Sequence, residues 1–162
     1  MSSYYNGSDS KEGKNTSPDL LIIGAGSGGF SAAIAAAEKG VNVAIIGTGI
    51  IGGTCVNVGC VPSKTMIRAT ETIHQAKQAS RFKGIEGDAK ITSWKALIDQ
   101  KQALADELRI AKYINVLPFY TNISYLNERA VFCNVGVMAG DVLYTPKKNN
   151  NSHWIISCTT FY

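Results

Sequence analysis

Long apolar stretches are absent from this chain of 162 residues. No run approaches the roughly 20 apolar residues that a membrane-spanning helix needs. Residues 1–17 contain no apolar core of the kind that signal peptides carry. The four cysteines do not follow the regular spacing of a disulfide framework. Together these absences predict a cytoplasmic protein, kept in a reducing compartment, with no membrane partner.

Charge of one sign is not concentrated in any segment of the chain. Lysine and arginine number 16 against 12 aspartates and glutamates, which gives a formal net charge of +4. A small and scattered surplus of this kind is typical of a solvated surface, so no nucleic-acid partner is expected. Residues 1–17 are rich in Ser, Asn, Gly and Lys. This composition predicts a disordered N-terminal tail.

A dinucleotide-binding pattern follows the tail. Residues 19–23 predict a short buried strand, residues 30–39 an alanine-rich helix and residues 41–46 a second strand parallel to the first. Between the first strand and the helix, Gly24, Gly26 and Gly29 match G-x-G-x-x-G. In this context the motif predicts a tight turn, a backbone that approaches a pyrophosphate and a helix that packs closely on the strand. The alternative is the same βαβ unit without a ligand.

The acidic residue that usually ends the second strand of such a unit is missing. Its position is taken by Gly47, and no acid occurs between Glu38 and Glu71. The carboxylate normally hydrogen-bonds the ribose. We therefore expect weakened nucleotide binding, which a Gly47→Glu substitution would restore, unless Gly47 is required for a positive φ.

Two cysteines, Cys55 and Cys60, stand five positions apart beyond the second strand. On a regular helix this spacing separates the Cα atoms by about 8–9 Å and 140°, too far for a disulfide. Gly59 permits unusual backbone angles and Pro62 suits the first turn of a helix. We therefore predict a tight loop that carries Cys55 and a helix that begins near Cys60.

The chemistry of these thiols has two interpretations. A helix N-terminus and the nearby Lys64 would lower the pKa of a thiol and favour the reactive thiolate. Alternatively, both cysteines are ordinary small buried side chains. The upstream nucleotide motif favours redox chemistry.

The rest of the chain predicts two long helices and a set of short strands. The helices are expected at residues 64–79 and 93–113, and the strands at 120–126, 130–135 and 142–144. Asn127 and Glu128 predict a hairpin turn between the first two strands. The apolar face of the second helix, expected in the core, is formed by Trp94, Leu97, Ile98, Leu104 and Leu108.

The glycine motif together with the segment GGTCVNVGCVPSK at residues 52–64 resembles the flavin-dependent pyridine nucleotide–disulfide oxidoreductases. Residues 65–69 and 106–113 look most like the mercuric reductases of this family, although dihydrolipoamide dehydrogenase and glutathione reductase are close alternatives. The resemblance spans roughly residues 18–132. It implies an α/β fold: a partial FAD-binding Rossmann-like domain, doubly wound, with a parallel sheet and a small antiparallel β-meander.

The resemblance also implies a site. Cys55 and Cys60 would form the redox disulfide, reduced by FAD, which is itself reduced by NAD(P)H. Cys60 would lie nearer the flavin and Cys55 would face the substrate, so both could bind Hg(II) transiently. The implied FAD-binding residues are Gly24, Ala25, Gly26, Ser27, Gly28, Gly29, Gly53, Thr54 and Lys64.

Several parts of the family pattern are missing from the sequence. No further glycine motif encodes an NAD(P)H domain, no C-terminal dimerisation domain follows, and Cys158 is a single cysteine in an unmatched context. We therefore expect an FAD-binding part at residues 18–145, an unassigned tail at 146–162 and no turnover by this chain alone. The remaining alternative is a fragment that binds FAD or a soft metal ion without catalysis.

Overall fold

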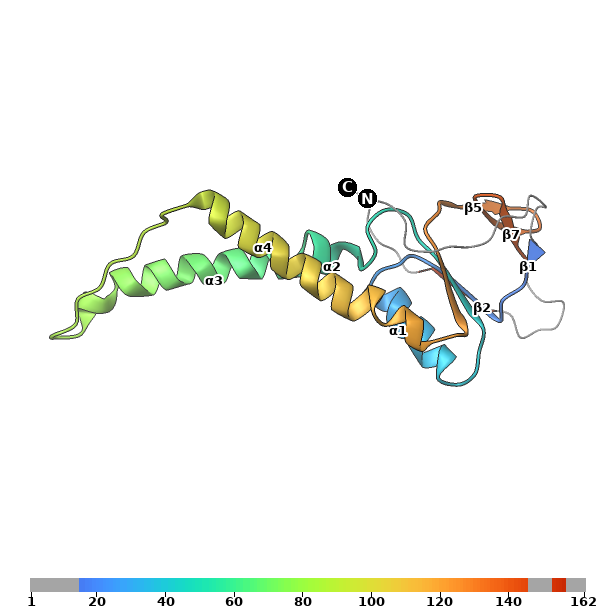
Figure 1. Cartoon of the computed structure of the whole chain (residues 1–162), viewed down its shortest axis with the longest axis horizontal. Coiled ribbons are helices and arrows are strands. Elements are labelled where there is room, and N and C mark those ends of the chain that lie inside the picture. The colour runs from blue at the N-terminus through green and yellow to red at the C-terminus, as the bar shows by residue number, and fades with distance from the viewer. Residues whose placement is uncertain (1–14, 146–152, 157–162) are drawn as a thin grey trace.

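A four-stranded parallel sheet forms the centre of the molecule (Figure 1). The computed structural model describes residues 15–145 and 153–156. The strand order is β4-β3-β2-β8, and all three pairings are parallel. The expectation of two parallel neighbouring strands around the glycine motif is confirmed, with Leu20 opposite Val43. The strands of this sheet are β2 (Leu20–Ile23), β3 (Val43–Ile46), β4 (Ile123–Leu126) and β8 (His153–Ile156).

Helix α1 (Ser27–Ala37) covers one face of this sheet. Its buried residues Phe30, Ala33 and Ala37 belong to a cluster with alternate residues of the strands, including Ile22 and Ile45. The small alanine side chains let the helix lie close to the strands. The helix begins three residues earlier than the sequence predicts, because the last glycines of the motif form its first turn and the Phe30 amide donates to the Gly26 carbonyl.

A second sheet covers the opposite face. Its strand order is β1-β7-β6-β5, with β5, β6 and β7 forming an antiparallel meander and β1 parallel to β7. Val137, Ala139 and Tyr144 pack against Leu21, Ala44 and Ile46, the strand residues that point away from α1. The predicted α/β fold is therefore confirmed as three layers. The strands of the second sheet are β1 (Asn15–Thr16), β5 (Ala130–Cys133), β6 (Gly136–Ala139) and β7 (Val142–Tyr144).

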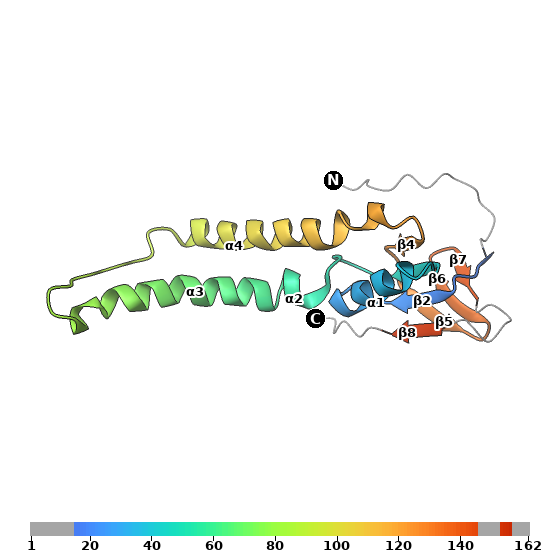
Figure 2. The same ribbon diagram turned by 90° about the horizontal axis from the view of Figure 1, so that it is seen from below.

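Two long helices lie side by side and extend away from the sheets, as Figures 1 and 2 show. Helix α3 (Cys60–Lys77) leads out and α4 (Trp94–Arg109) leads back. The N-terminus of α4 is capped by Ser93, whose Oγ accepts a hydrogen bond of 3.2 Å from the Ala96 amide. The described residues also include four short helices: α2 (Gly53–Asn57), η1 (Ala79–Arg81), the π-helical η2 (Ile110–Ile114) and η3 (Leu117–Phe119). Within the described ranges, no helix is long and apolar enough to cross a membrane.

The core predicted along the second long helix is wrong for most of its length. Trp94 is 56% exposed, and Ile98 and Leu104 are exposed as well. The physical reason is that the outer part of α4 extends beyond the sheets, where only α3 lies beside it. Near the sheet the helix does contribute, because Ala105 is buried and Leu108 packs against the core.

The predicted hairpin at Asn127 and Glu128 is also wrong. Strand β4 pairs in parallel with β3, whereas β5 belongs to the other sheet and pairs with β6, so the hairpin turn lies between Cys133 and Gly136. Strand β6 was not expected. Two short strands form at the edges of the predicted tails, β1 by pairing with β7 and β8 by pairing with β2. Otherwise these tails, at residues 1–14, 146–152 and 157–162, lie outside the described residues.

Removing side-chain volume from the central sheet should destabilise the fold strongly. Ile45 is completely buried on β3, so Ile45→Ala is expected to lower the free energy of unfolding by about 2–5 kcal/mol. Ile67→Ala on α3 is the matched control, because Ile67 is 61% exposed. Urea titrations followed by circular dichroism measure both. An equal loss in the two variants would contradict the assignment of the core.

Candidate active site

The glycine loop joins β2 to α1 and has no room for a side chain at Gly29. Gly24 has a positive φ of 116°, which the tight turn requires. A Cβ atom at Gly29 would lie 2.2 Å from the Gly24 carbonyl oxygen and 3.2 Å from a methyl carbon of Ile22. Gly29 therefore allows α1 to approach the strand, in agreement with the packing role that the sequence predicts for it.

The N-terminus of α1 is open to solvent. Its N-cap residue, Gly26, offers no side chain to cap the helix, and no acidic residue occurs in the first turn. Ser27 and Gly28 are exposed there. The first amides of a helix carry positive partial charge and have no partner within the helix. This end of α1 can therefore accept a phosphate group.

The segment that follows β3 lies directly against the glycine loop. The Gly52 amide donates a hydrogen bond of 2.8 Å to the Ala25 carbonyl, and Gly26 and Gly52 form an isolated parallel bridge. Gly52 has a φ of 101° and a Cβ atom there would lie 3.1 Å from the ring of Tyr113. These contacts place the chain just before the cysteines next to the predicted nucleotide site.

Gly47 lies at the end of β3 and packs against the same loop. A Cβ atom at this position would lie 2.6 Å from the Ala25 Cβ and 2.9 Å from the Ala25 nitrogen. Gly47 does not have a positive φ, so the obstacle to a side chain is contact with Ala25 rather than backbone strain. The expectation that Gly47→Glu simply restores a ribose-binding carboxylate is therefore corrected, because glutamate would displace the glycine loop.

The two cysteines belong to different helices. Cys55 lies on the short α2 (Gly53–Asn57) and Cys60 is the first residue of α3. Between them the chain turns sharply, and the Gly59 amide donates 2.7 Å to the Thr54 carbonyl. The predicted break in the helix and the position of Cys60 are confirmed. The loop expected around Cys55 is wrong, because residues 53–57 form one helical turn.

Cys60 is the main influence on the pKa of the Cys55 thiol. A hydrogen bond from the Cys60 side chain raises this pKa, and partial loss of hydration and the charge of Cys60 act in the same direction, whereas the backbone of Cys60 lowers it. Lys64 lowers the pKa of Cys55, as expected from its charge, but it is outweighed. Both cysteines are free and exposed. Cys55 is therefore a protonated thiol at neutral pH when the pair is reduced.

In the described part of the chain, a metal ion could be held only by a pair of potential side-chain ligands, such as Cys55 and Cys60. No group of three or more His, Cys, Asp or Glu side chains comes together there. Two adjacent thiols suit a soft ion that accepts two sulfur ligands.

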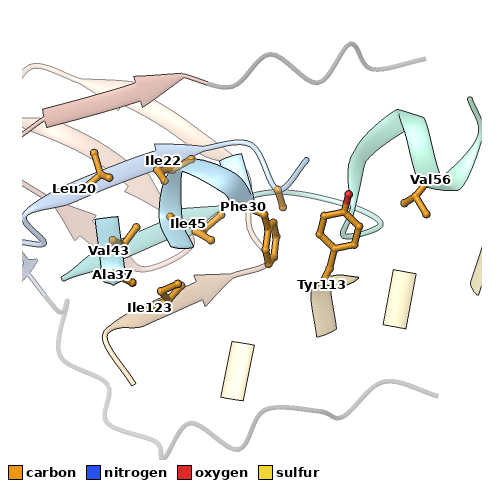
Figure 3. Packing of buried hydrophobic residues seen from close by; sticks show 11 residues of the cluster. Leu20, Ile22, Phe30, Ala37, Val43, Ile45, Val56, Tyr113 and Ile123 are labelled. Atoms are coloured by element: carbon orange, nitrogen blue, oxygen red, sulfur yellow. The ribbon is translucent and has the colours of Figure 1, made fainter. Parts of the chain in front are cut away.

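Three residues outside the predicted site help to hold α2: Asn57, its last residue, and Arg109 and Tyr113, which contact it. Asn57 and Arg109 are joined by a hydrogen bond, and Tyr113 packs between Phe30 and α2. The rings of Phe30 and Tyr113 meet edge to face at 5.0 Å, and Figure 3 shows Tyr113 between Phe30 and Val56. The sequence gives no indication of these contacts, because the residues that meet are far apart in the chain.

Comparison with known proteins defines the class. The family described as pyridine nucleotide-disulphide oxidoreductase matches residues 18–132. The chain belongs to this family, whose members are flavin-dependent enzymes.

Its relatives narrow the class further. The mercuric reductase of Streptomyces lividans is 48% identical over 106 residues, which cover 65% of this chain and 22% of that protein. The mercuric reductase of Shigella flexneri is 41% identical over 126 residues, covering 78% of this chain and 22% of the relative. The chain thus spans about a fifth of the length of these curated relatives. Among solved structures, the HOCl-induced flavoprotein disulfide reductase RclA from Escherichia coli matches with a TM-score of 0.62 and 26% identity, over 85% of this chain and 27% of that one.

The raised pKa of Cys55 predicts a response to removal of its partner. In Cys60→Ala the hydrogen bond and the charge that raise the pKa are lost, so the pKa of Cys55 should fall. A larger thiolate fraction at pH 8 should then make alkylation of Cys55 by iodoacetamide faster than in the reduced wild-type chain. Mass spectrometry of the Cys55 peptide measures the rate. The exposed Cys133 in the same sample is the internal control, and an unchanged or slower rate at Cys55 would contradict the assignment.

Proposed function

We propose that this chain is the FAD-binding and dithiol-bearing part of a mercuric reductase, in which Cys55 and Cys60 are the redox-active pair and Hg(II) is the substrate. The observation that carries the proposal is that the segment leading to the two cysteines lies against the glycine loop, where the Gly52 amide donates to the Ala25 carbonyl. Electron transfer between a bound flavin and a dithiol requires such a neighbourhood. The mercuric reductase relatives support Hg(II) as the substrate, and the predicted cytoplasmic location is part of the proposal.

The open N-terminus of α1 fits the pyrophosphate of FAD. It offers amides without a side-chain cap, no competing carboxylate, and a close approach of α1 to the loop that only glycine at position 29 allows. Gly53 and Thr54 on α2 and Lys64 on α3 would lie on the flavin side. When bound and reduced by NAD(P)H, which would be the co-substrate of the whole enzyme, the flavin would supply the electron pair that reduces the Cys55–Cys60 disulfide to the dithiol. The residues that would hold the pyrophosphate are Gly24, Ala25, Gly26, Ser27, Gly28 and Gly29.

The thiol pair would bind Hg(II) through both sulfur atoms. Hg(II) is a soft ion that favours thiolate ligands, and the exposure of Cys55 and Cys60 gives it access. Each thiol releases its proton as its sulfur–mercury bond forms. Because Cys55 is protonated at neutral pH, binding through both sulfurs should release protons to the solvent. The positive charge of Lys64 favours the deprotonated form of Cys55.

The dithiol should hold Hg(II) against a monothiol competitor. With excess glutathione, the reduced full chain is expected to retain one Hg(II), because the second sulfur binds within the same molecule. Cys55→Ser and Cys60→Ser should each weaken retention by about a hundredfold or more. Mass spectrometry of the native protein after equilibration measures the bound metal.

Cys133→Ser is the control, because Cys133 is exposed on β5, away from the pair. It should retain Hg(II) like the wild type. Loss of Hg(II) from the wild type, or full retention by Cys55→Ser, would contradict a dithiol substrate site.

Displacing the glycine loop should weaken flavin binding. Gly29→Ala places a Cβ against the Gly24 carbonyl, so the loop must shift, and FAD affinity is expected to fall by at least about tenfold. Quenching of FAD fluorescence measures the affinity, and circular dichroism shows whether the variant is folded. Ser31→Ala, an exposed position on the same helix, is the control. Equal FAD affinity in the two variants, or none in the wild type, would contradict the proposal.

A second candidate has a specific observation behind it. A solved structure of RclA that is 29% identical to this chain, with a TM-score of 0.55, is described as its Cu(II) complex. The alternative substrate is therefore a copper ion or a disulfide compound. Excess glutathione reduces Cu(II) to Cu(I), so a Cu(I) salt takes the place of Hg(II) in the same competition. Retention of copper together with loss of Hg(II) would favour the second candidate.

A further inference from the structure

Asn57 connects α2, the helix that carries Cys55, to two other segments. Its side-chain nitrogen donates 3.0 Å to the Ile51 carbonyl and 2.8 Å to the Gly53 carbonyl. Its side-chain oxygen accepts a hydrogen bond of 3.0 Å from Nη1 of Arg109. One amide side chain therefore joins the loop before α2, the end of α2 and the last residue of α4.

Arg109 is placed to use both ends of its guanidinium group. Nη1 donates to Asn57, and Nη2 forms an ion pair of 2.8 Å with Asp106 one turn earlier on α4. The side chain of Arg109 is only 20% exposed. An arginine held by a carboxylate at one nitrogen presents the other in a defined direction, which a flexible ammonium group does not do.

The cysteine helix needs such an external support. Helix α2 has only five residues and no side-chain cap at its N-terminus. A helix this short is not stable by itself, so its orientation depends on tertiary contacts. It is joined to α3 by Val58 and Gly59 alone, and Cys55 and Cys60 lie on either side of this joint. Any rotation of α2 against α3 would change the approach of the two sulfur atoms.

We propose that Arg109 is a positioning residue for the Cys55–Cys60 pair: through Asn57 it holds α2 in the orientation that keeps the two thiols within reach of each other. This inference rests on the proposed function of the pair as a redox dithiol. The residue touches neither sulfur atom, so it acts on the probability that the two sulfurs meet.

The equilibrium of the pair with glutathione measures this probability. In that reaction the two thiols and one molecule of glutathione disulfide give the Cys55–Cys60 disulfide and two molecules of glutathione. The protein loses two electrons and two protons, and the glutathione disulfide gains them. The equilibrium constant is an effective concentration of one thiol at the other, and it rises when the pair is preorganised. A general loss of stability that affects the reduced and oxidised states equally leaves it unchanged.

The experiment uses the full chain in glutathione redox buffers, with the two states quantified by acid quenching, alkylation and mass spectrometry. In Arg109→Ala the effective concentration is expected to fall by about ten- to a hundredfold, corresponding to the loss of a hydrogen bond to a charged donor. Arg109→Lys keeps the positive charge but loses the two-pronged guanidinium group, so the effective concentration in this variant should lie between those of Arg109→Ala and the wild type. Arg68→Ala is the matched control, because Arg68 forms an exposed pair with Glu71 on α3.

The outcomes separate this inference from the proposed function. If the wild-type pair forms a reversible disulfide and both Arg109 variants match Arg68→Ala, the positioning role is overturned while the dithiol function stands. If the wild-type pair forms no disulfide, the proposed function itself fails. Circular dichroism and urea titration identify the folded fraction of each variant. Should Arg109→Ala not fold, Arg109→Lys decides the question by the same comparison.

Discussion

Burial of both faces of β2 and β3 is the constraint on which the other features depend. Alternate residues of these strands pack against α1 on one side and against the antiparallel sheet on the other. Strands buried in this way cannot shift in register without exposing apolar side chains. Their carboxyl ends are therefore fixed side by side. The glycine loop leaves one of these ends and the chain toward the cysteines leaves the other, so the sheet itself brings the two halves of the site together.

Much of the site is held together by backbone contacts rather than by side chains. Ala25 is contacted by Gly47 and bonded to Gly52, and in both places a side chain would collide with a neighbour. The same packing that leaves no space for a carboxylate at Gly47 holds the chain before the cysteines against the glycine loop. The pKa of Cys55, by contrast, depends mainly on Cys60, because the hydrogen bond to Cys60 raises it and outweighs the opposite effect of Lys64.

Local sequence patterns were sufficient for most elements around the site, although not for the helical turn that carries Cys55, and they were insufficient beyond it. The strand–glycine–helix–strand unit and the helix break before Cys60 depend on neighbouring residues, and they were predicted correctly. The hairpin at Asn127 and the buried face of the helix that carries Trp94 were wrong. A strand pattern does not say which sheet a strand joins, and an apolar helix face does not say whether a partner lies opposite it. In this chain β4 joined the parallel sheet, and the outer part of α4 extends past it.

The sequence by itself determined the chemistry that is available: a glycine loop that admits a phosphate, two thiols that no regular helix could bring together, and no acid at Gly47. These properties follow from residue type and from spacings of a few residues. Only the tertiary structure decided how the parts are held. The hydrogen bond from Arg109 to Asn57 joins residues 52 positions apart, and the ring of Tyr113 contacts that of Phe30, which lies far earlier in the chain. Such contacts arise because the long helical excursion returns to the sheet beside the cysteine helix, a geometry that depends on how whole elements pack rather than on any local pattern.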